Sequence, residues 1–396
     1  MIVFVITSAG ISAVTVSTHN RTAASADAAP VTSSTGAGNS TRGLRRIGKG
    51  GEAGAGIGSL DAAVRLCRRA LTRQSTTSLR ESSKALYHYL IAPIEKQLAG
   101  VSSLWIVPDG PLALLPFEAI LLADGKYLVE KYDVRYVQSL RVAQMLRDRT
   151  YDQPRKSLLA FGGAVYEKES TENKEDKTPK TALDAVSLER SVKYAHRSLG
   201  YGQWKDLPGT LREVEALGAL YEDARVVTGA EVTESSLKAM AASGELKNYR
   251  MLHFATHGMV VPEAPELSAL VLSQMGKPDA GSEDGFLSMR EVAKLQLAAD
   301  VVTLSACETG LGKVYSGEGV VGLGQAFLIA GANGLTLSLW QVADESTKTL
   351  MVDVYGLVEK EGITFANALT RVKREFINDP AHSHPFYWAP FVYYGQ

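Results

Sequence analysis

Two stretches of the chain decide its fold: Leu252-His253-Phe254-Ala255-Thr256-His257-Gly258 and Val301-Val302-Thr303-Leu304-Ser305-Ala306-Cys307. The second is a continuous run of apolar or small residues before its cysteine, which is typical of a strand covered on both faces, as in a parallel sheet. Each stretch carries a reactive side chain at its end, His257 in the first and Cys307 in the second. Sites in open α/β sheets form at the carboxyl ends of the strands, so we expect both side chains at one edge.

His257 and Cys307 have the chemistry of a nucleophilic catalyst. A thiol becomes a strong nucleophile as thiolate, and a nearby imidazole can take its proton. The two residues are 307 − 257 = 50 positions apart, which leaves room for one crossover between neighbouring strands. The glycine at 258 allows its backbone N–H to approach a substrate carbonyl, and with the N–H of Cys307 it would form an oxyanion hole. We therefore predict His257, Cys307 and Gly258 as the catalytic residues.

The same residues admit other interpretations. Cys307 could be a buried apolar cysteine, and His257 could be a strand-end histidine bonded to backbone. His253, four residues before His257, is predicted as a core histidine or as a partner of the pair. The spacing His-x-x-x-His lacks the glutamate of the metalloprotease motif, which disfavours zinc. The glycines at 317, 319 and 322 match a dinucleotide fingerprint, but they do not follow the strand directly. We expect no metal and no cofactor.

The two stretches resemble the CHAT family of caspase-like cysteine peptidases, which is related to caspases and separases. Caspases carry the signature Q-A-C-[RQG]-G with a histidine about 50 residues upstream; the segment from Ser305 to Gly310 shares its Ala-Cys core but not its flanks. Other segments that resemble the CHAT family follow one another across residues 80–396: Ile106 to Leu112, Leu115 to Glu118, Leu207 to Thr210 with Glu213 and Glu215, Gly317 to Gly319, Ser338 to Asp344, and Trp388 to Phe391.

The resemblance implies a caspase-like three-layer α/β/α fold with a mostly parallel sheet, and strand and helix patterns do alternate through the second half of the chain. It also implies that a non-catalytic caspase-like half precedes the catalytic half. The predicted parts are a disordered or low-complexity tail at 1–58, a short helical region at 59–100, the non-catalytic half at 101–165, a charged linker at 166–205 and the catalytic half at 206–396.

Local patterns predict individual elements within these parts. The strands expected outside the two central stretches are 104–107, two short strands within 127–140, and 156–163, 225–228, 270–273, 335–340 and 391–394. The expected helices are 60–71, 79–98 with a bend at Pro93, one within 186–199, one following 208–210, one from 233, 287–297 with a capping box at its start, a helix through 325–330, and 345–358 and 364–376.

The composition is that of an ordinary globular protein. The formal net charge is −1 and hydrophobic residues make up 45% of the chain, so there is no electrostatic case for direct nucleic-acid binding. The only two cysteines, Cys67 and Cys307, exclude a disulfide framework and favour a reducing, cytoplasmic location. The apolar start at 2–6 is too short to span a bilayer and lacks the positive flank of a secretory signal, so we expect no membrane association.

Four residues near the predicted strand ends are candidates for substrate binding: Ser305, Glu308, Trp340 and Asp344. Metacaspases carry an acidic residue two positions before the nucleophile. That position is Ser305 here, which argues against a preference for Arg or Lys from this source. Glu308 and Asp344 are the acidic alternatives, although Asp344 could instead cap the next helix. Trp340 would line a pocket wall or belong to the core.

The expected function is that of a thiol protease, a cysteine endopeptidase that cleaves a partner protein through an acyl-enzyme. The resemblance implies a protein substrate and a regulatory or defence-related cleavage of the kind found in bacterial relatives, and it leaves room for a regulatory or activating partner protein. Two alternatives stay open: a catalytically silent CHAT scaffold for protein–protein interaction, and a thiol amidase that acts on small substrates.

Overall fold

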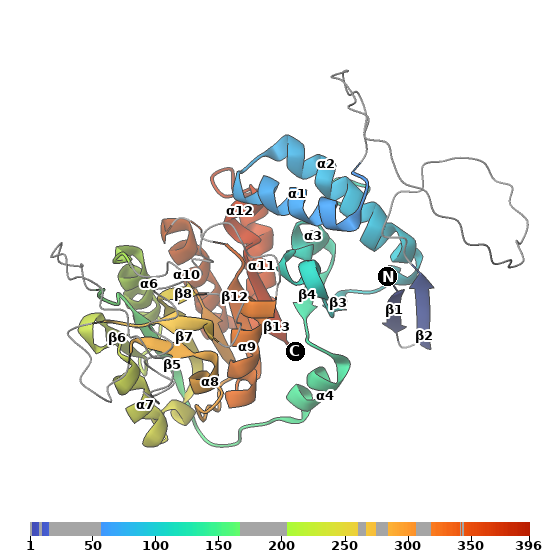
Figure 1. Cartoon of the computed structure of the whole chain (residues 1–396). Coiled ribbons are helices and arrows are strands. Elements are labelled where there is room, and N and C mark those ends of the chain that lie inside the picture. The colour runs from blue at the N-terminus through green and yellow to red at the C-terminus, as the bar shows by residue number, and fades with distance from the viewer. Residues whose placement is uncertain are drawn as a thin grey trace, which may run out of the picture.

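The computed structural model describes residues 2–7, 10–15, 57–166, 204–259, 267–274, 284–305, 318–340, 342 and 344–396. Cys307, Glu308 and the helix expected within 186–199 lie outside these residues. A central sheet of eight strands runs through the described part (Figure 1), in the order β3-β4-β13-β12-β11-β7-β5-β6. Its strands are β3 (Ser103–Ile106), β4 (Asp133–Tyr136), β5 (Lys156–Gly162), β6 (Arg225–Thr228), β7 (Tyr249–Ala255), β11 (Val301–Leu304), β12 (Gly334–Ser338) and β13 (Phe391–Gly395).

The sheet is mostly parallel, as predicted. Every neighbouring pair is parallel except β12 and β13, which run antiparallel from Gly334 opposite Gly395 to Ser338 opposite Phe391. A second sheet of three short antiparallel strands, β8 (His257–Met259), β9 (Ala269–Val271) and β10 (Phe286–Ser288), follows the carboxyl end of β7. A separate hairpin is formed by β1 (Ile2–Thr7) and β2 (Gly10–Thr15).

Helices cover both faces of the central sheet, which gives three layers (Figure 1). One face carries α6 (Pro208–Gly218), α10 (Asp344–Glu361) and α11 (Phe365–Asn378), while α9 (Glu318–Ala330) packs on the other. The remaining helices are α1 (Leu60–Thr72), α2 (Thr76–Leu86), α3 (Leu128–Lys131), α4 (Leu140–Asp148), α7 (Glu234–Ala242), α8 (Met289–Val292) and α12 (Pro385–Trp388). The predicted α/β/α fold is therefore confirmed.

Packing of small residues sets the distance between the layers. A Cβ on Gly324 of α9 would lie 2.3 Å from a methyl of Leu335 in β12, so this glycine allows the close approach of that helix to the sheet. On the opposite face, a Cβ on Gly162 would lie 2.7 Å from the carbonyl oxygen of Thr210 in the first turn of α6. The strand predicted to end in glycines thus needs them where α6 begins.

The amino-terminal helices form the region predicted at 59–100. Ser59 caps α1 by accepting a hydrogen bond from the N–H of Ala62 at 3.2 Å, and the side chain of Cys67 is buried, as its place on the apolar stripe predicted. The second helix does not run on to residue 98. After α2, the chain continues as a π-helical turn at Tyr87–Ile91 and a 3₁₀ helix at Ala92–Leu98, a change of path at the predicted Pro93.

Two predictions of local structure were wrong. The segment 127–140 contains one strand, β4, rather than two, because its start forms α3, in which the N–H of Tyr127 donates to Glu130 Oε2 at 2.6 Å. The crossover helix predicted at 287–297 is only the four-residue α8, since Phe286–Ser288 pair with β9. Its predicted capping box is present, and Glu291 Oε2 accepts from the N–H of Ser288 at 2.8 Å.

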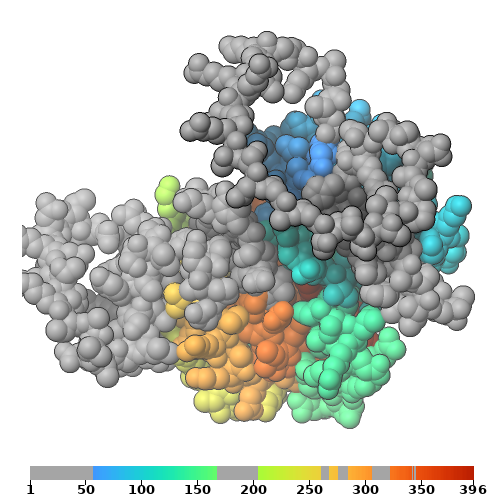
Figure 2. Space-filling view, turned by 45° about the vertical axis from the view of Figure 1, so that its right-hand side comes forward, coloured from blue at the N-terminus to red at the C-terminus, as the bar shows by residue number. Residues whose placement is uncertain are grey.

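The strands of the two predicted halves belong to one sheet. β3 and β4 form one end of it, but β5 lies between β7 and β6, inside the second half. The connection from α4 to β5 therefore passes the strands that lie between β4 and β5, and the space-filling view shows the green residues around α4 beside the orange residues around α9 (Figure 2). The domain boundaries at 165 and 206 stay a prediction. No helix of the described residues is long and apolar enough to cross a membrane.

Candidate active site

The site is built on two neighbouring parallel strands. β7 pairs with β11, with Phe254 opposite Leu304, and the ladder continues where the N–H of Ser305 donates to the carbonyl of Phe254 at 2.9 Å. His257 stands three positions after Phe254 in the chain, and Cys307 stands three positions after Leu304. The register therefore brings the backbone that precedes each predicted catalytic residue to the same edge of the sheet.

His257 is buried and its ring is oriented by one short hydrogen bond. Its side chain lies in β8, where it pairs with Val271, and the residue is 1% exposed. The ring nitrogen Nε2 lies 2.7 Å from the carbonyl oxygen of Lys205. A carbonyl oxygen only accepts, so Nε2 carries a proton. In the neutral imidazole, Nδ1 is then the basic nitrogen, as a general base requires.

Two aromatic side chains hold the imidazole of His257. The ring centroid of Tyr166 lies 5.1 Å away at an interplanar angle of 56°, and that of Trp204 lies 5.0 Å away at 45°. Tyr166 is fixed in turn, because its hydroxyl donates to the carbonyl of Val271 at 3.1 Å and its N–H donates to Asp206 Oδ1 at 3.1 Å. Trp204 also contacts Phe286, with ring centroids 6.5 Å apart.

Both ends of the predicted charged linker therefore pack against His257. No pattern in the sequence predicts this role for Tyr166, Trp204 or Lys205. The one indication in the sequence is Trp204, because a large aromatic residue is unusual at the end of a linker that is predicted to be exposed. Lys205 offered none, because it contributes its backbone carbonyl and any residue type supplies one.

Gly258, the predicted oxyanion-hole glycine, lies in β8 directly after His257. It is buried and pairs with Leu270 of β9. The three-stranded sheet thus holds the backbone of residues 257 to 259 in a fixed extended conformation at the edge of the large sheet. The other predicted donor, Cys307, lies outside the described residues, so the oxyanion hole stays a prediction.

Ser305 is half-buried and its hydroxyl is used within the protein. Its Oγ donates to Glu213 Oε1 at 2.5 Å, and the same carboxylate oxygen lies 3.0 Å from Nε2 of His253. Glu213 and His253 are 3% and 0% exposed, so this contact is internal rather than part of an open pocket. His253, which was predicted as a core histidine or as a partner of the catalytic pair, is buried and contacts Glu213, the residue that also binds Ser305.

The remaining predicted binding residues lie beyond the end of β12. Trp340 is 4% exposed, and its Nε1 donates to the carbonyl of Phe386 at 3.2 Å, which places the indole in the core. Asp344 is the first residue of α10. It lies inside the helix, one position after the N-cap that the capping role requires. Among the described residues, no group of three or more His, Cys, Asp or Glu side chains could hold a metal ion.

Comparisons with known proteins place these features in context. The family model of the CHAT domain matches residues 80–396. Tetratricopeptide repeat protein 28 of Homo sapiens is 25% identical to this chain over 368 residues, and that of Mus musculus is 24% identical over 368 residues. Each match covers 82% of this chain but only 13% and 14% of the two relatives, so the chain spans about one seventh of their length or less.

Two solved structures have a similar fold. The separase–securin complex of Saccharomyces cerevisiae matches 79% of this chain and 17% of the other, with 14% identity and a TM-score of 0.39. The Arg-specific cysteine proteinase gingipain R matches 83% of this chain and 69% of the other, with 10% identity and a TM-score of 0.41.

Proposed function

Because this chain belongs to the CHAT family, we propose that it is a cysteine endopeptidase that cleaves a partner protein with Cys307 as nucleophile and His257 as general base. The observation that supports this most is the pairing of β7 with β11. Phe254 lies opposite Leu304, and the predicted catalytic residue follows each of them by three positions in the sequence. The orientation of His257 by the Lys205 carbonyl adds a second support, since it fixes which nitrogen acts as base.

The proposed reaction has two steps. His257 Nδ1 takes the proton of the Cys307 thiol, and the thiolate attacks the peptide carbonyl carbon. A C–S bond forms while the carbonyl electrons move to oxygen, where the N–H groups of Gly258 and Cys307 stabilise the charge. The imidazolium then protonates the leaving amine as the C–N bond breaks. Water, deprotonated by His257, hydrolyses the thioester and restores the thiol.

The Lys205 carbonyl has a further role in this scheme. The positive charge that forms on His257 during the reaction increases the strength of the Nε2–H···O bond, because hydrogen bonds from a charged donor are stronger. Tyr166 and Trp204 pack against the ring, and His257 is only 1% exposed, so little water reaches it. The surroundings of His257 thus favour one orientation through both protonation states.

We further propose that Glu308 and Asp344 contribute to substrate selection, and that Ser305 and Trp340 act mainly through the structure that supports the site. The internal contacts of Ser305 and Trp340 support this division. A protein partner is supported by the relatives, which are tetratricopeptide repeat proteins by name and far longer than this chain. A regulatory or defence-related cleavage in the cytoplasm is part of the same proposal.

A thiol-reactive peptide probe and a peptide-library digest read by mass spectrometry test the proposal together. The wild-type protein should be labelled and should cut internal peptide bonds, whereas Cys307→Ala should do neither. Hydrolysis of small amides without peptide cleavage would favour the amidase alternative. An intact protein that neither reacts nor cleaves would contradict the peptidase and favour the scaffold.

A further inference from the structure

We propose that Glu213 is a positioning residue for the catalytic pair, acting through one carboxylate oxygen that joins the strand ends leading to both catalytic residues. This inference rests on the proposed function. Glu213 Oε1 accepts from Ser305 Oγ at 2.5 Å and lies 3.0 Å from His253 Nε2. Ser305 stands two positions before Cys307, and His253 stands four positions before His257.

The contacts of Glu213 belong to a network between two layers of the fold. His253 in β7 lies opposite Thr303 in β11, so both side chains face the helices on one side of the sheet. Tyr355 of α10 lies there, with its hydroxyl 3.0 Å from His253 Nδ1 and 3.0 Å from Thr303 Oγ1. Glu213 of α6 completes the network at Ser305. Side-chain contacts therefore link two helices to two neighbouring strands.

Burial makes the network sensitive to the loss of one member. Glu213 is 3% exposed, and His253, Thr303 and Tyr355 are each 0% exposed. A buried polar group that loses its partner costs about 1–3 kcal/mol, so the four groups hold one another in a single arrangement. The end of β11 shares in that arrangement through the hydroxyl of Ser305. A shift of about 1 Å at a catalytic group can lower the rate about 100-fold.

A second buried carboxylate provides a matched control. Glu118 is 2% exposed, accepts from Lys373 Nζ at 2.8 Å and accepts a short hydrogen bond from the hydroxyl of Tyr136. This network lies between β4 and α11, and β13 and β12 separate β4 from β11 in the sheet. Substitution of Glu118 should therefore lower stability to a similar extent as substitution of Glu213 without changing the catalytic pair.

The test measures how fast iodoacetamide alkylates Cys307 in the intact protein as a function of pH. The chain has only one other cysteine, Cys67, and burial raises its pKa to about 12, so label on the folded protein reports Cys307. The proteins compared are the wild type and four variants: Glu213→Ala, Glu213→Gln, Ser305→Ala and Glu118→Ala. The melting temperature and the kcat and KM for a cleaved peptide are measured for each.

Removal of the carboxylate should slow alkylation about 10- to 100-fold near pH 7 and move its midpoint toward that of an ordinary thiol, about 8.5. The value of kcat should fall with it, with KM within about 3-fold. Glu213→Gln retains an oxygen that accepts both hydrogen bonds, so it should stay within about 3-fold of wild type. Ser305→Ala should move the midpoint in the same direction by a smaller amount.

Two results would overturn the positioning role: a wild-type rate and midpoint in Glu213→Ala, or an equal change in Glu118→Ala. If Glu213→Ala does not fold, Ser305→Ala decides, because it removes one hydroxyl and should fold; an unchanged midpoint there overturns the role. Failure of the proposed function itself would give a result that can be told apart from these two. In that case the wild type itself would alkylate with the same rate and midpoint as His257→Ala.

Discussion

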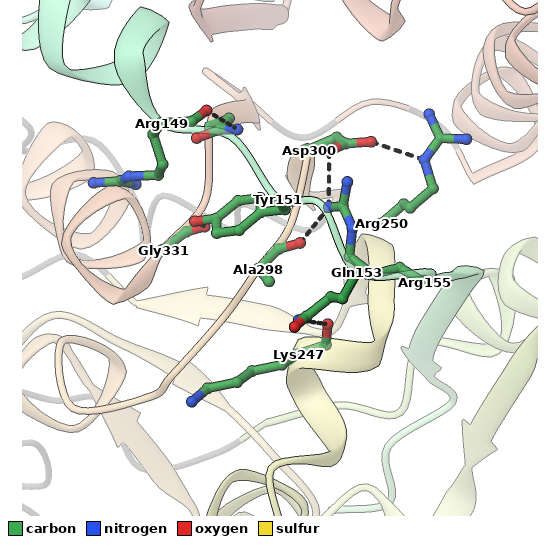
Figure 3. A network of polar contacts seen from close by, with 10 residues as sticks. Arg149, Tyr151, Gln153, Arg155, Lys247, Arg250, Ala298, Asp300 and Gly331 are labelled. Carbon is green, nitrogen blue, oxygen red and sulfur yellow. Dashed lines mark hydrogen bonds and ion pairs between the residues drawn. The ribbon is translucent and has the colours of Figure 1, made fainter.

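The parallel strands of the central sheet begin at one edge, the amino edge, and end at the opposite edge, the carboxyl edge. Different kinds of contact stabilise the two edges. At the amino edge, the connection from α4 to β5 donates to backbone carbonyls. Arg149 donates to those of Leu328 and Ala332. Tyr151 donates to that of Gly331 and Arg155 to that of Ala298, and Figure 3 shows these four residues. At the carboxyl edge, Ser305, Glu213 and His253 are joined side chain to side chain, while His257 contacts the carbonyl of Lys205.

This difference distinguishes residues that stabilise the fold from residues that position the catalytic groups. A backbone carbonyl is present whatever the residue type, so the acceptors at the amino edge survive substitution. Contacts between side chains need the right residue at both ends. We expect substitutions at the amino edge to lower stability with little effect on activity, and substitutions at the carboxyl edge to lower activity with a smaller effect on stability.

The largest effect should come from the carboxyl edge itself. His257→Ala removes the general base, and kcat/KM for peptide cleavage should fall about 1,000-fold or more. The ring packs against Tyr166 and Trp204, so some loss of stability is expected, and a melting curve must show that the variant is folded at the assay temperature. A folded His257→Ala protein with the activity of wild type would contradict the role of His257 as the general base.

Trp204 tests whether the contacts around the imidazole matter for the rate. Trp204→Ala should lower kcat about 10-fold, because the ring of His257 loses the surface that holds one of its faces, while Trp204→Phe should stay within about 3-fold. Steady-state kinetics on one peptide is sufficient. Equal activity of the alanine and phenylalanine variants would show that His257 is oriented without the help of Trp204.

The amino edge should respond in stability instead. Arg155 donates to Asp300 Oδ1 at 2.8 Å and its side chain is 10% exposed, whereas Arg250 contacts the other oxygen of Asp300 with a side chain 54% exposed (Figure 3). Arg155→Met should lower the free energy of unfolding by about 1–3 kcal/mol, and Arg250→Met by less than about 1 kcal/mol.

Urea denaturation gives both values, and peptide cleavage measured below the unfolding transition should stay within about 2-fold of wild type for each variant. The comparison of the two edges would fail if Arg155→Met lost activity tenfold while keeping its stability. A difference between the two arginine variants in stability, with equal activity, would support the comparison of the two edges.

The smallest effect is a change in how stability depends on pH. Burial lowers the pKa of His384, whose Nδ1 accepts from the N–H of Phe386 at 3.1 Å at the start of α12. The unfolded chain therefore binds a proton more readily, and the stability present above the unfolded pKa of about 6.5 is lost as pH falls through the folded value.

His384→Asn keeps a capping acceptor and removes the titration. The free energy of unfolding of this variant should fall less than that of wild type between about pH 7 and pH 5. Urea denaturation at several pH values measures the two slopes. Parallel curves for wild type and variant would show that His384 does not contribute to the acid sensitivity of the fold.

The sequence predicted the strands best where one signal was continuous. β7 and β11 were found because each is an apolar run of strand length that ends near a reactive residue and a glycine. The segment 127–140 was misread, because its alternation of apolar residues is compatible with a strand, whereas the structure forms a helical turn stabilised by Glu130 and Tyr127. Local contacts of that kind compete with the pattern.

The site was only partly predictable for a different reason. His257 was identified from the chemistry of its side chain, but the groups that orient it come from elsewhere in the chain. Lys205 acts through a carbonyl, which no residue type signals. Glu213 was noted only as a family landmark, because its contacts with Ser305 and His253 depend on how α6 docks on the sheet. Tertiary packing, rather than local pattern, decides both.

The central claim is that His257 and Cys307 meet at one edge of the sheet. Treatment of the native protein with 1,3-dibromoacetone tests this directly, since the reagent loses two bromides and joins a thiolate to a nearby imidazole through three carbons. We predict a cross-linked peptide pair that contains Cys307 and His257, identified by mass spectrometry after digestion. Attachment at Cys307 alone, or a bridge from Cys307 to a different histidine, would contradict the claim.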